Sequence, residues 1–124
     1  MRSALLVLAL LSASAALPAR AGAGSITPEM DQEVQAGIDA IYSMDFDAAQ
    51  ADFERFKALA PGHPFGDFGL ACVGWARYVY GSEMGDDALL KPFDQDVART
   101  VADAKTWLAA HPRDPEALLA LGAA

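Results

Sequence analysis

Apolar side chains recur at three- and four-residue steps along most of the chain, which is the spacing of one face of an α-helix. Two such stripes precede Pro61: Met30, Val34, Ile38, Ile41 and Tyr42, then Phe46, Ala49, Phe53, Phe56 and Ala60. Only residues 43–45 separate the stripes, which leaves room for nothing longer than a sharp turn. The pattern therefore predicts two amphipathic helices folded back on each other.

Polar residues mark where these helices begin and end. Thr27 is suited to cap the first helix, with Pro28 at its first position, and Asp45 is suited to cap the second. Gly37 lies in mid-helix, where glycine costs about 1 kcal/mol relative to alanine, so we expect a neighbouring helix to pack closely there. Charged side chains are expected on the outer face of the second helix: Asp47, Asp52, Glu54, Arg55 and Lys57.

Two further stripes follow Pro64. Phe65, Phe68, Cys72, Trp75, Ala76 and Val79 form the first, and Phe93, Val97, Val101, Ala104 and Leu108 form the second. The second stripe predicts a helix over 93–110, and a last helix is expected to begin at Asp114-Pro115. Residues 81–87 are a loop by composition. Few β-branched residues and much alanine favour helix over sheet, so the expected fold class is all-α.

The spacing of Gly37, Ala49, Phe53 and Pro61 resembles the pattern of the tetratricopeptide repeat family. The chain departs from that pattern at Ala36, where the family has leucine, and at Ala40, where it has tyrosine. The resemblance implies antiparallel helix hairpins stacked as a short right-handed α-solenoid over residues 28–124. Its units would be about 28–63, 64–112 with an insertion, and 113–124, which is incomplete.

The family period of 34 residues relates the three units. It carries Gly37 onto Ala71 inside the second unit, and Leu121-Gly122 fits the family's leucine–glycine pair in the third. The middle unit is longer than the period by about half a repeat. We expect the extra residues within 81–92, where Pro92 interrupts a helix. An incomplete last unit implies either further repeats beyond it or another subunit that covers it.

The first 21 residues predict a secretory signal peptide. Arg2 gives a positive start, Ala4 to Leu11 is an unbroken apolar run, and small residues around Ala21 offer a cleavage site. A membrane anchor is the alternative, but a spanning helix needs about 20 apolar residues. We therefore expect an exported protein, periplasmic or secreted, with residues 22–27 as a flexible mature N-terminus and no stable membrane span after cleavage.

Charge and motifs narrow the function classes. Acidic side chains outnumber basic ones 17 to 9, for a net charge of −8, which disfavours nucleic acid and anionic membranes as partners. Gly-rich phosphate loops and the metalloprotease and hydrolase signatures are absent from the sequence, so we expect a non-enzyme with no cofactor and no metal.

Several residues have two interpretations. His63 and His111 are expected as cations at helix C-termini, with a ligand or a general base as the alternative. Cys72 is expected to be a buried inert thiol rather than a nucleophile. The acidic pairs Asp45-x-Asp47 and Asp86-Asp87 are expected to cap helices, with a cation site as the alternative.

Aromatic residues are the strongest candidates for a binding site. The family resemblance implies that the first helices of successive units line a concave groove that holds a protein or peptide segment. That geometry places Ile38, Tyr42, Phe68 and Trp75 near the groove, although these side chains would also suit a core between units. The leading hypothesis is an exported interaction scaffold. A soluble binder of a small ligand or cation, and an accessory segment of a longer exported enzyme, are the alternatives.

Overall fold

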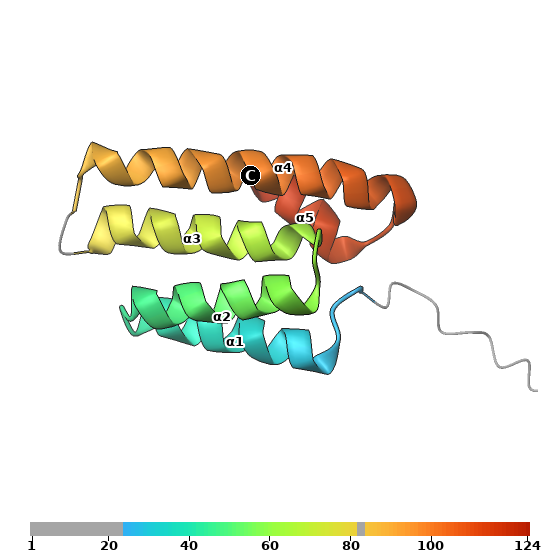
Figure 1. Cartoon of the computed structure of the whole chain (residues 1–124), viewed down its shortest axis with the longest axis horizontal. Helices are drawn as coiled ribbons and strands as arrows, with labels where there is room; N and C mark the ends of the chain where they lie inside the picture. Colours follow the sequence, from blue (N-terminus) through green and yellow to red (C-terminus); the bar gives the residue numbers. More distant parts are fainter. Residues whose placement is uncertain (1–23, 82–83) are drawn as a thin grey trace, which may run out of the picture.

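Five α-helices make up the part of the chain that the computed structural model describes, residues 24–81 and 84–124. They are α1 (Pro28–Tyr42), α2 (Phe46–Leu59), α3 (Pro64–Tyr80), α4 (Leu90–Ala110) and α5 (Pro115–Ala123). A short 3-10 helix, η1 (Asp87–Leu89), precedes α4. Adjacent helices run antiparallel, and these ranges contain no strand (Figure 1). The predicted all-α fold class is therefore confirmed.

Each helix packs mainly on the next one along the chain. In addition, α3 contacts α1 and α5, whereas α2 and α4 do not contact each other. In Figure 1, α1 to α4 follow one another as a stack, and α5 lies behind α3 and α4. Because neighbours are antiparallel, α1, α3 and α5 run in the same direction. The contacts place α3 between α2 and α4, and both α1 and α5 pack against α3 as well.

The caps of α1, α2 and α5 are those that the sequence predicts. The side chain of Thr27 accepts a hydrogen bond from the Met30 amide at 3.3 Å, and that of Asp45 accepts one from the Ala48 amide at 3.1 Å. Asp114 accepts from the amides of Glu116 and Ala117 at the start of α5. Each bond satisfies a first-turn amide that has no partner within its helix.

Phe53 is the centre of the first core cluster, which also contains Ala49, Leu70 and Val73. A Cβ added to Gly37 of α1 would lie 2.7 Å from Cε2 of Phe53, and one added to Gly69 of α3 would lie closer still to the same ring. Because Gly37 and Gly69 have no side chains, α1 and α3 leave room between them for the Phe53 ring of α2. This close approach confirms the reason expected for a glycine inside α1.

A second core cluster contains Val34, Phe56 and Ala60, with Ile26, Met30 and Phe65 packed against it. Ile26 belongs to the segment 22–27, which the sequence predicts as a flexible N-terminus. In the structure, this segment lies against the helices from Gly24 onward, because Ile26 packs on the core and Ser25 contacts His63. The expected signal peptide, residues 1–21, lies outside the described residues.

The second helix pair differs from the prediction in where its extra length lies. Helix α4 begins at Leu90 rather than Phe93, so Pro92 is its third residue. Proline is tolerated there because a first-turn amide needs no acceptor within the helix. The added residues are not confined to 81–92: α3 has 17 residues against 15 in α1, and α4 has 21 against 14 in α2.

Burial corrects two expectations about helix faces and shows one buried polar residue, Thr100, that the sequence pattern does not predict. Tyr42 does not join the buried stripe of α1, since it is 85% exposed. Asp52, expected on the outer face of α2, is buried and pairs with Arg55. Thr100 is fully buried in α4, where its hydroxyl donates to the Asp96 carbonyl oxygen at 2.8 Å. That bond satisfies the hydroxyl and allows its burial.

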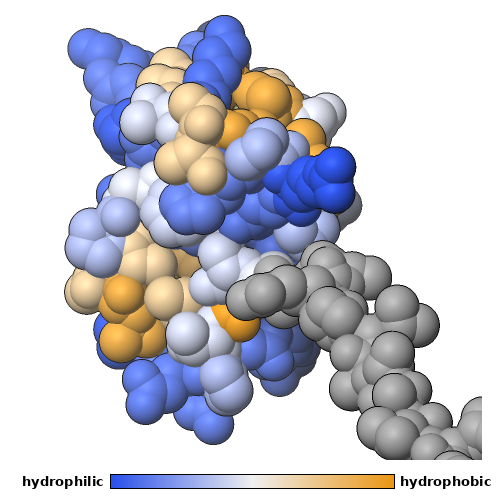
Figure 2. Space-filling view, turned by 90° about the vertical axis from the view of Figure 1, so that its right-hand side faces the viewer, coloured by the Kyte–Doolittle hydropathy of each residue, from blue (hydrophilic) through white to orange (hydrophobic). Residues whose placement is uncertain are grey.

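Figure 2 shows the end of the molecule where α1, α3 and α5 begin. Hydrophobic areas alternate there with a hydrophilic band, so this view presents no single continuous apolar face. None of the helices in the described ranges is both long enough and apolar enough to cross a bilayer.

Candidate functional site

The main candidate site is an open pocket of about 450 Å³ between α1, α3, α4 and α5, which we call the aromatic groove. Its lining is mostly apolar and contains five aromatic residues and the single cysteine. The lining residues are Ile41, Tyr42, Phe68, Ala71, Cys72, Trp75, Ala76, Tyr80, Phe93, Val97, Ala123 and Ala124. Pockets of this size and character are typical of binding sites for small molecules and peptide side chains.

The structure brings together three of the four residues that the sequence places near a groove. Tyr42, Phe68 and Trp75 all line the aromatic groove, whereas Ile38 lies on α1, 36% exposed, outside the lining. Trp75 is 49% exposed and Tyr42 is 85% exposed, so neither ring is buried in the core. Aromatic side chains that stay accessible beside an apolar pocket are the usual anchors for a bound partner.

Sequence reasoning missed Tyr80 and Phe93 as lining residues. Tyr80 follows Phe68, Cys72 and Ala76 at four-residue steps, so helical spacing places it on the same face of α3. Phe93 reaches the groove from α4, and its ring centroid lies 5.6 Å from that of Trp75. The expectation that only first helices line the groove excluded it.

Cys72 is partly exposed and lines the aromatic groove, so the expectation of a buried thiol is corrected. Its surroundings within the lining are apolar, and burial raises the pKa of the thiol. The sulfur is therefore protonated at neutral pH, which is the less nucleophilic form.

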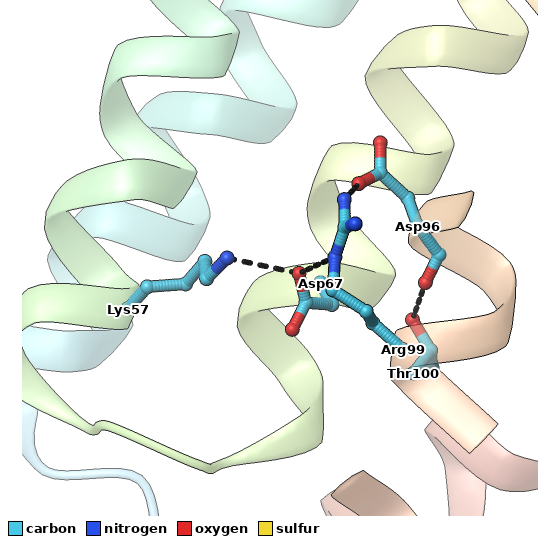
Figure 3. Close-up of polar contacts among 5 residues, drawn as sticks. All are labelled: Lys57, Asp67, Asp96, Arg99 and Thr100. Atoms are coloured by element: carbon cyan, nitrogen blue, oxygen red, sulfur yellow. Dashed lines mark hydrogen bonds and ion pairs between the residues drawn. The ribbon is translucent and has the colours of Figure 1, made fainter. Parts of the chain in front are cut away.

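Apart from the aromatic groove, a cluster of charged side chains around Asp67 of α3 links three helices (Figure 3). The buried Asp67 carboxylate accepts from Lys57 Nζ of α2 at 2.9 Å and from Arg99 Nε of α4 at 3.3 Å. Arg99 also pairs with Asp96 on its own helix. Because α2 and α4 do not contact each other, this shared carboxylate is a polar connection between them.

Two more carboxyl groups lie near this cluster. Burial raises the pKa of Asp96, although its hydrogen bond with Arg99 opposes the rise. Burial also raises the pKa of Asp103, and the charge of Asp67 raises it further. The cluster thus holds three carboxyl groups and two cations. Its side chains are engaged with one another, which favours a structural role.

Another cluster joins the N-terminal segment to the turns that precede α3 and α5. Ser25 Oγ lies 2.5 Å from His63 Nε2, and Trp107 Nε1 donates to Asp114 Oδ2 at 2.9 Å. Burial raises the pKa of Asp114, but hydrogen bonds from Ser25, the Ala117 amide and Trp107 lower it more, to about 2. Asp114 is therefore a carboxylate at neutral pH.

Serine, histidine and aspartate meet here, but their hydrogen bonds run in the wrong direction for a nucleophilic serine. His63 Nδ1 accepts from the Phe65 amide at 3.1 Å, so the neutral ring carries its proton on Nε2 and donates to Ser25. A catalytic base must instead accept the serine proton, with aspartate behind the histidine. Here Asp114 interacts with the serine itself. The cluster anchors the N-terminal segment.

His63 is not the helix C-terminal cation that the sequence predicts. It caps the N-terminus of α3 and is almost fully buried, and burial lowers its pKa. His111 does lie at the C-terminus of α4, where it is exposed and stacks on Trp107 with the ring centroids 4.5 Å apart.

The acidic pairs have partners within the protein. Asp45 caps α2, Asp86 caps η1 by accepting from the Ala88 amide, and Asp47 pairs with Arg77 at 2.7 Å. Across residues 24–81 and 84–124, no group of histidine, cysteine or acidic side chains is arranged to hold a metal ion.

Comparison of the chain with protein-family models, with curated proteins and with solved structures finds no match.

Proposed function

We propose that this protein is an exported, non-enzymatic scaffold that binds a segment of another protein in the aromatic groove. The observation that carries the proposal is the convergence of Tyr42, Phe68 and Trp75 on one open apolar pocket. These side chains come from α1 and α3, which run in the same direction and contact each other. Such a surface presents aromatic anchors from successive helix hairpins to one extended ligand.

The same architecture supports a tetratricopeptide-like arrangement as part of the proposal. Each hairpin packs its first helix on the first helix of the next, as α1–α3 and α3–α5 do. In this arrangement the aromatic groove lies beside the first helices, and Phe93 and Val97 of α4 complete its lining. Because the groove is open to solvent, it favours an extended segment whose two ends continue beyond the pocket over a ligand that is fully enclosed.

The test is binding of a crosslinked partner to variants of the groove. A photo-crosslinking residue in place of Ile38, which is 36% exposed on α1 and outside the lining of the groove, identifies the partner in an extract of the cells that make the protein, and purified partner is then titrated. We expect Trp75→Ala and Tyr42→Ala each to weaken binding by about 1–3 kcal/mol, because truncation of an aromatic side chain that the bound partner covers has that effect.

Leu59→Ala is the matched control, since Leu59 is 44% exposed on α2 and does not line the groove. Circular dichroism checks that all variants keep their helices. Unchanged affinity in both aromatic variants, with helices intact, would contradict the proposal.

A small apolar ligand is the second candidate, because about 450 Å³ is within the range of small-molecule pockets. Thermal-shift screening of aromatic and aliphatic ligands tests it. A rise in melting temperature that Trp75→Ala abolishes would favour this candidate over a protein partner.

Export is a separate part of the proposal, supported by the sequence of residues 1–21 alone. Cell fractionation and the mass of the mature N-terminus test it. We expect the mature protein outside the cytoplasm, beginning near Gly22. Recovery of the uncleaved chain from the cytoplasm would contradict this expectation.

A further inference from the structure

We propose that the segment bound in the aromatic groove is cationic. Its apolar side chains would enter the pocket, and its lysine or arginine side chains would lie over the exposed aromatic rings. This inference rests on the proposed function and adds the chemistry of the partner.

The distribution of basic side chains is the first observation. None of the side chains that line the aromatic groove carries a charge. A separate pocket of about 400 Å³, between the starts of α1 and α5 and so toward the other end of these helices from Tyr42 and Ala123, has Asp31 and Glu116 as its only charged lining residues. By contrast, Lys57, Arg77 and Arg99 all line the pocket between α2, α3 and α4.

The basic side chains within residues 24–81 and 84–124 either form ion pairs or lie outside the lining of the groove. Lys57 and Arg99 pair with Asp67, and Arg77 pairs with Asp47. The other basic residues lie outside the lining of both pockets: Arg55, Lys91, Lys105 and Arg113. An acidic segment in the groove would therefore find no cation there, and would be repelled by the net charge of −8.

Exposed aromatic rings are the second observation. Tyr42, Trp75 and Tyr80 line the same pocket and keep 85%, 49% and 64% of their surfaces accessible. The faces of such rings attract ammonium and guanidinium groups, and tryptophan does so most strongly. The acidic molecule also attracts a basic segment at long range, which speeds encounter at low ionic strength.

The experiment uses three fluorescent peptides of one length and one set of leucine anchors. Their polar positions carry lysine in the first, glutamine in the second and glutamate in the third. We expect the lysine peptide to bind about tenfold more tightly than the glutamine peptide at low salt, and the glutamate peptide to bind least. High salt should reduce the advantage of lysine, since exposed charges are then screened.

Trp75→Leu separates ring attraction from apolar burial, because leucine keeps an apolar side chain without a π face. We expect this variant to lose most of the preference for lysine over glutamine while it still binds the glutamine peptide. Asp94→Asn, which directly follows the groove-lining Phe93, should reduce binding of the lysine peptide about twofold through charge. Asp31→Asn, which is exposed near the start of α1 and outside the lining of the groove, is the control.

The outcomes separate the two proposals. Equal or tighter binding of the glutamine or glutamate peptide, lost in Trp75→Ala, would overturn the cationic partner and leave the groove as a binding site. Binding of the lysine peptide that Trp75→Ala and Trp75→Leu leave unchanged would overturn the cationic partner as well, since attraction would then come from the surface at large. If none of the peptides binds, both the groove and its cationic partner are contradicted for segments of this kind.

Discussion

His63 is enclosed by aromatic rings from three helices. Its ring centroid lies 5.5 Å from that of Phe56, 6.5 Å from that of Phe65 and 4.7 Å from that of Trp107. Burial lowers the pKa of His63, the charge of Asp114 raises it, and His111 lowers it further. The folded protein therefore prefers the neutral ring, whose Nδ1 must stay free of a proton to cap α3.

This preference makes stability depend on pH. A histidine whose pKa is lower in the folded state contributes stability that is fully present above its unfolded pKa of about 6.5 and is lost as pH falls below that value. We predict a decline in the free energy of unfolding below pH 6.5, by up to about 1.4 kcal/mol per pH unit from this group. Urea unfolding at a series of pH values between 8 and 5 measures the decline.

His63→Asn tests the origin of that decline, because asparagine keeps a cap for α3 but does not titrate. We expect the variant to be less stable at pH 8, because the ring leaves a cavity, yet to show a shallower slope below pH 6.5. His111→Asn is the matched control at the exposed end of α4. An unchanged slope in His63→Asn would assign the pH dependence to other groups.

At the scale of elements, glycine has opposite roles in α1 and α5. A Cβ at Gly37 would meet the buried Phe53 ring, whereas one at Gly122 would have no heavy atom within 4 Å among the described neighbours. The sequence pattern pairs these two glycines as equivalent positions of a repeat. Their surroundings differ because, within the described residues, α5 contacts only α4 and α3, whereas α1 packs closely on α2.

Alanine substitutions at these two glycines should therefore change the stability of the protein in opposite directions. We predict that Gly37→Ala lowers stability by about 1–3 kcal/mol, because overpacking outweighs the gain in helix propensity. Gly122→Ala should raise stability by a few tenths to about 1 kcal/mol, because only the propensity term applies. Thermal unfolding monitored by circular dichroism checks both. Partial recovery of Gly37→Ala by Phe53→Leu would tie the loss to the ring.

Helices were the most predictable level of this structure. Their starts follow from local chemistry at Thr27, Asp45 and Asp114, and their buried faces follow from spacing. The start of α4 was missed because Pro92 was taken as a barrier, although the first turn tolerates it. The burial of Asp67 was missed because its partners, Lys57 and Arg99, belong to other helices. Thr100 has a local partner, the Asp96 carbonyl oxygen, but it was missed because the predicted stripe of α4 contains only apolar residues. One signal was present: Asp67 shares a helical face with Leu70 and Ala71.

At the scale of the whole molecule, the two hairpins are joined mainly through α3. Because α2 and α4 do not contact each other, the ion pairs from Lys57 and Arg99 to Asp67 bridge the gap between them. Lys57 and Arg99 keep 34% and 51% of their side-chain surfaces exposed, so they remain partly hydrated if the pairing is lost. The carboxylate itself is buried.

We predict that Asp67→Asn lowers the free energy of unfolding by about 1–3 kcal/mol, as expected for a lost charged hydrogen-bond acceptor. The variant should also depend less on salt than the parent, since both ion pairs weaken. Urea unfolding at low and high salt measures both effects. Asp94→Asn on exposed α4 controls for the change in net charge. An equal loss in that control would remove the special role of Asp67.

The candidate site was partly predictable at this scale. Tyr42, Phe68 and Trp75 were named from the expected geometry of first helices, and one pocket contains them. The share of α4 in that pocket depends on how far Phe93 extends beside Trp75, which no spacing along the sequence expresses. The N-terminal anchor through Ser25 was likewise invisible, because it joins residues 38 positions apart.

The packing of the Phe53 ring against Gly37 and Gly69 should constrain how this sequence evolves. A change of side-chain size at any one of these three positions alters which residues the other two can accept. Among relatives of this chain, residues 37, 53 and 69 should vary together: a smaller residue at 53 should accompany alanine or serine at 37 or 69.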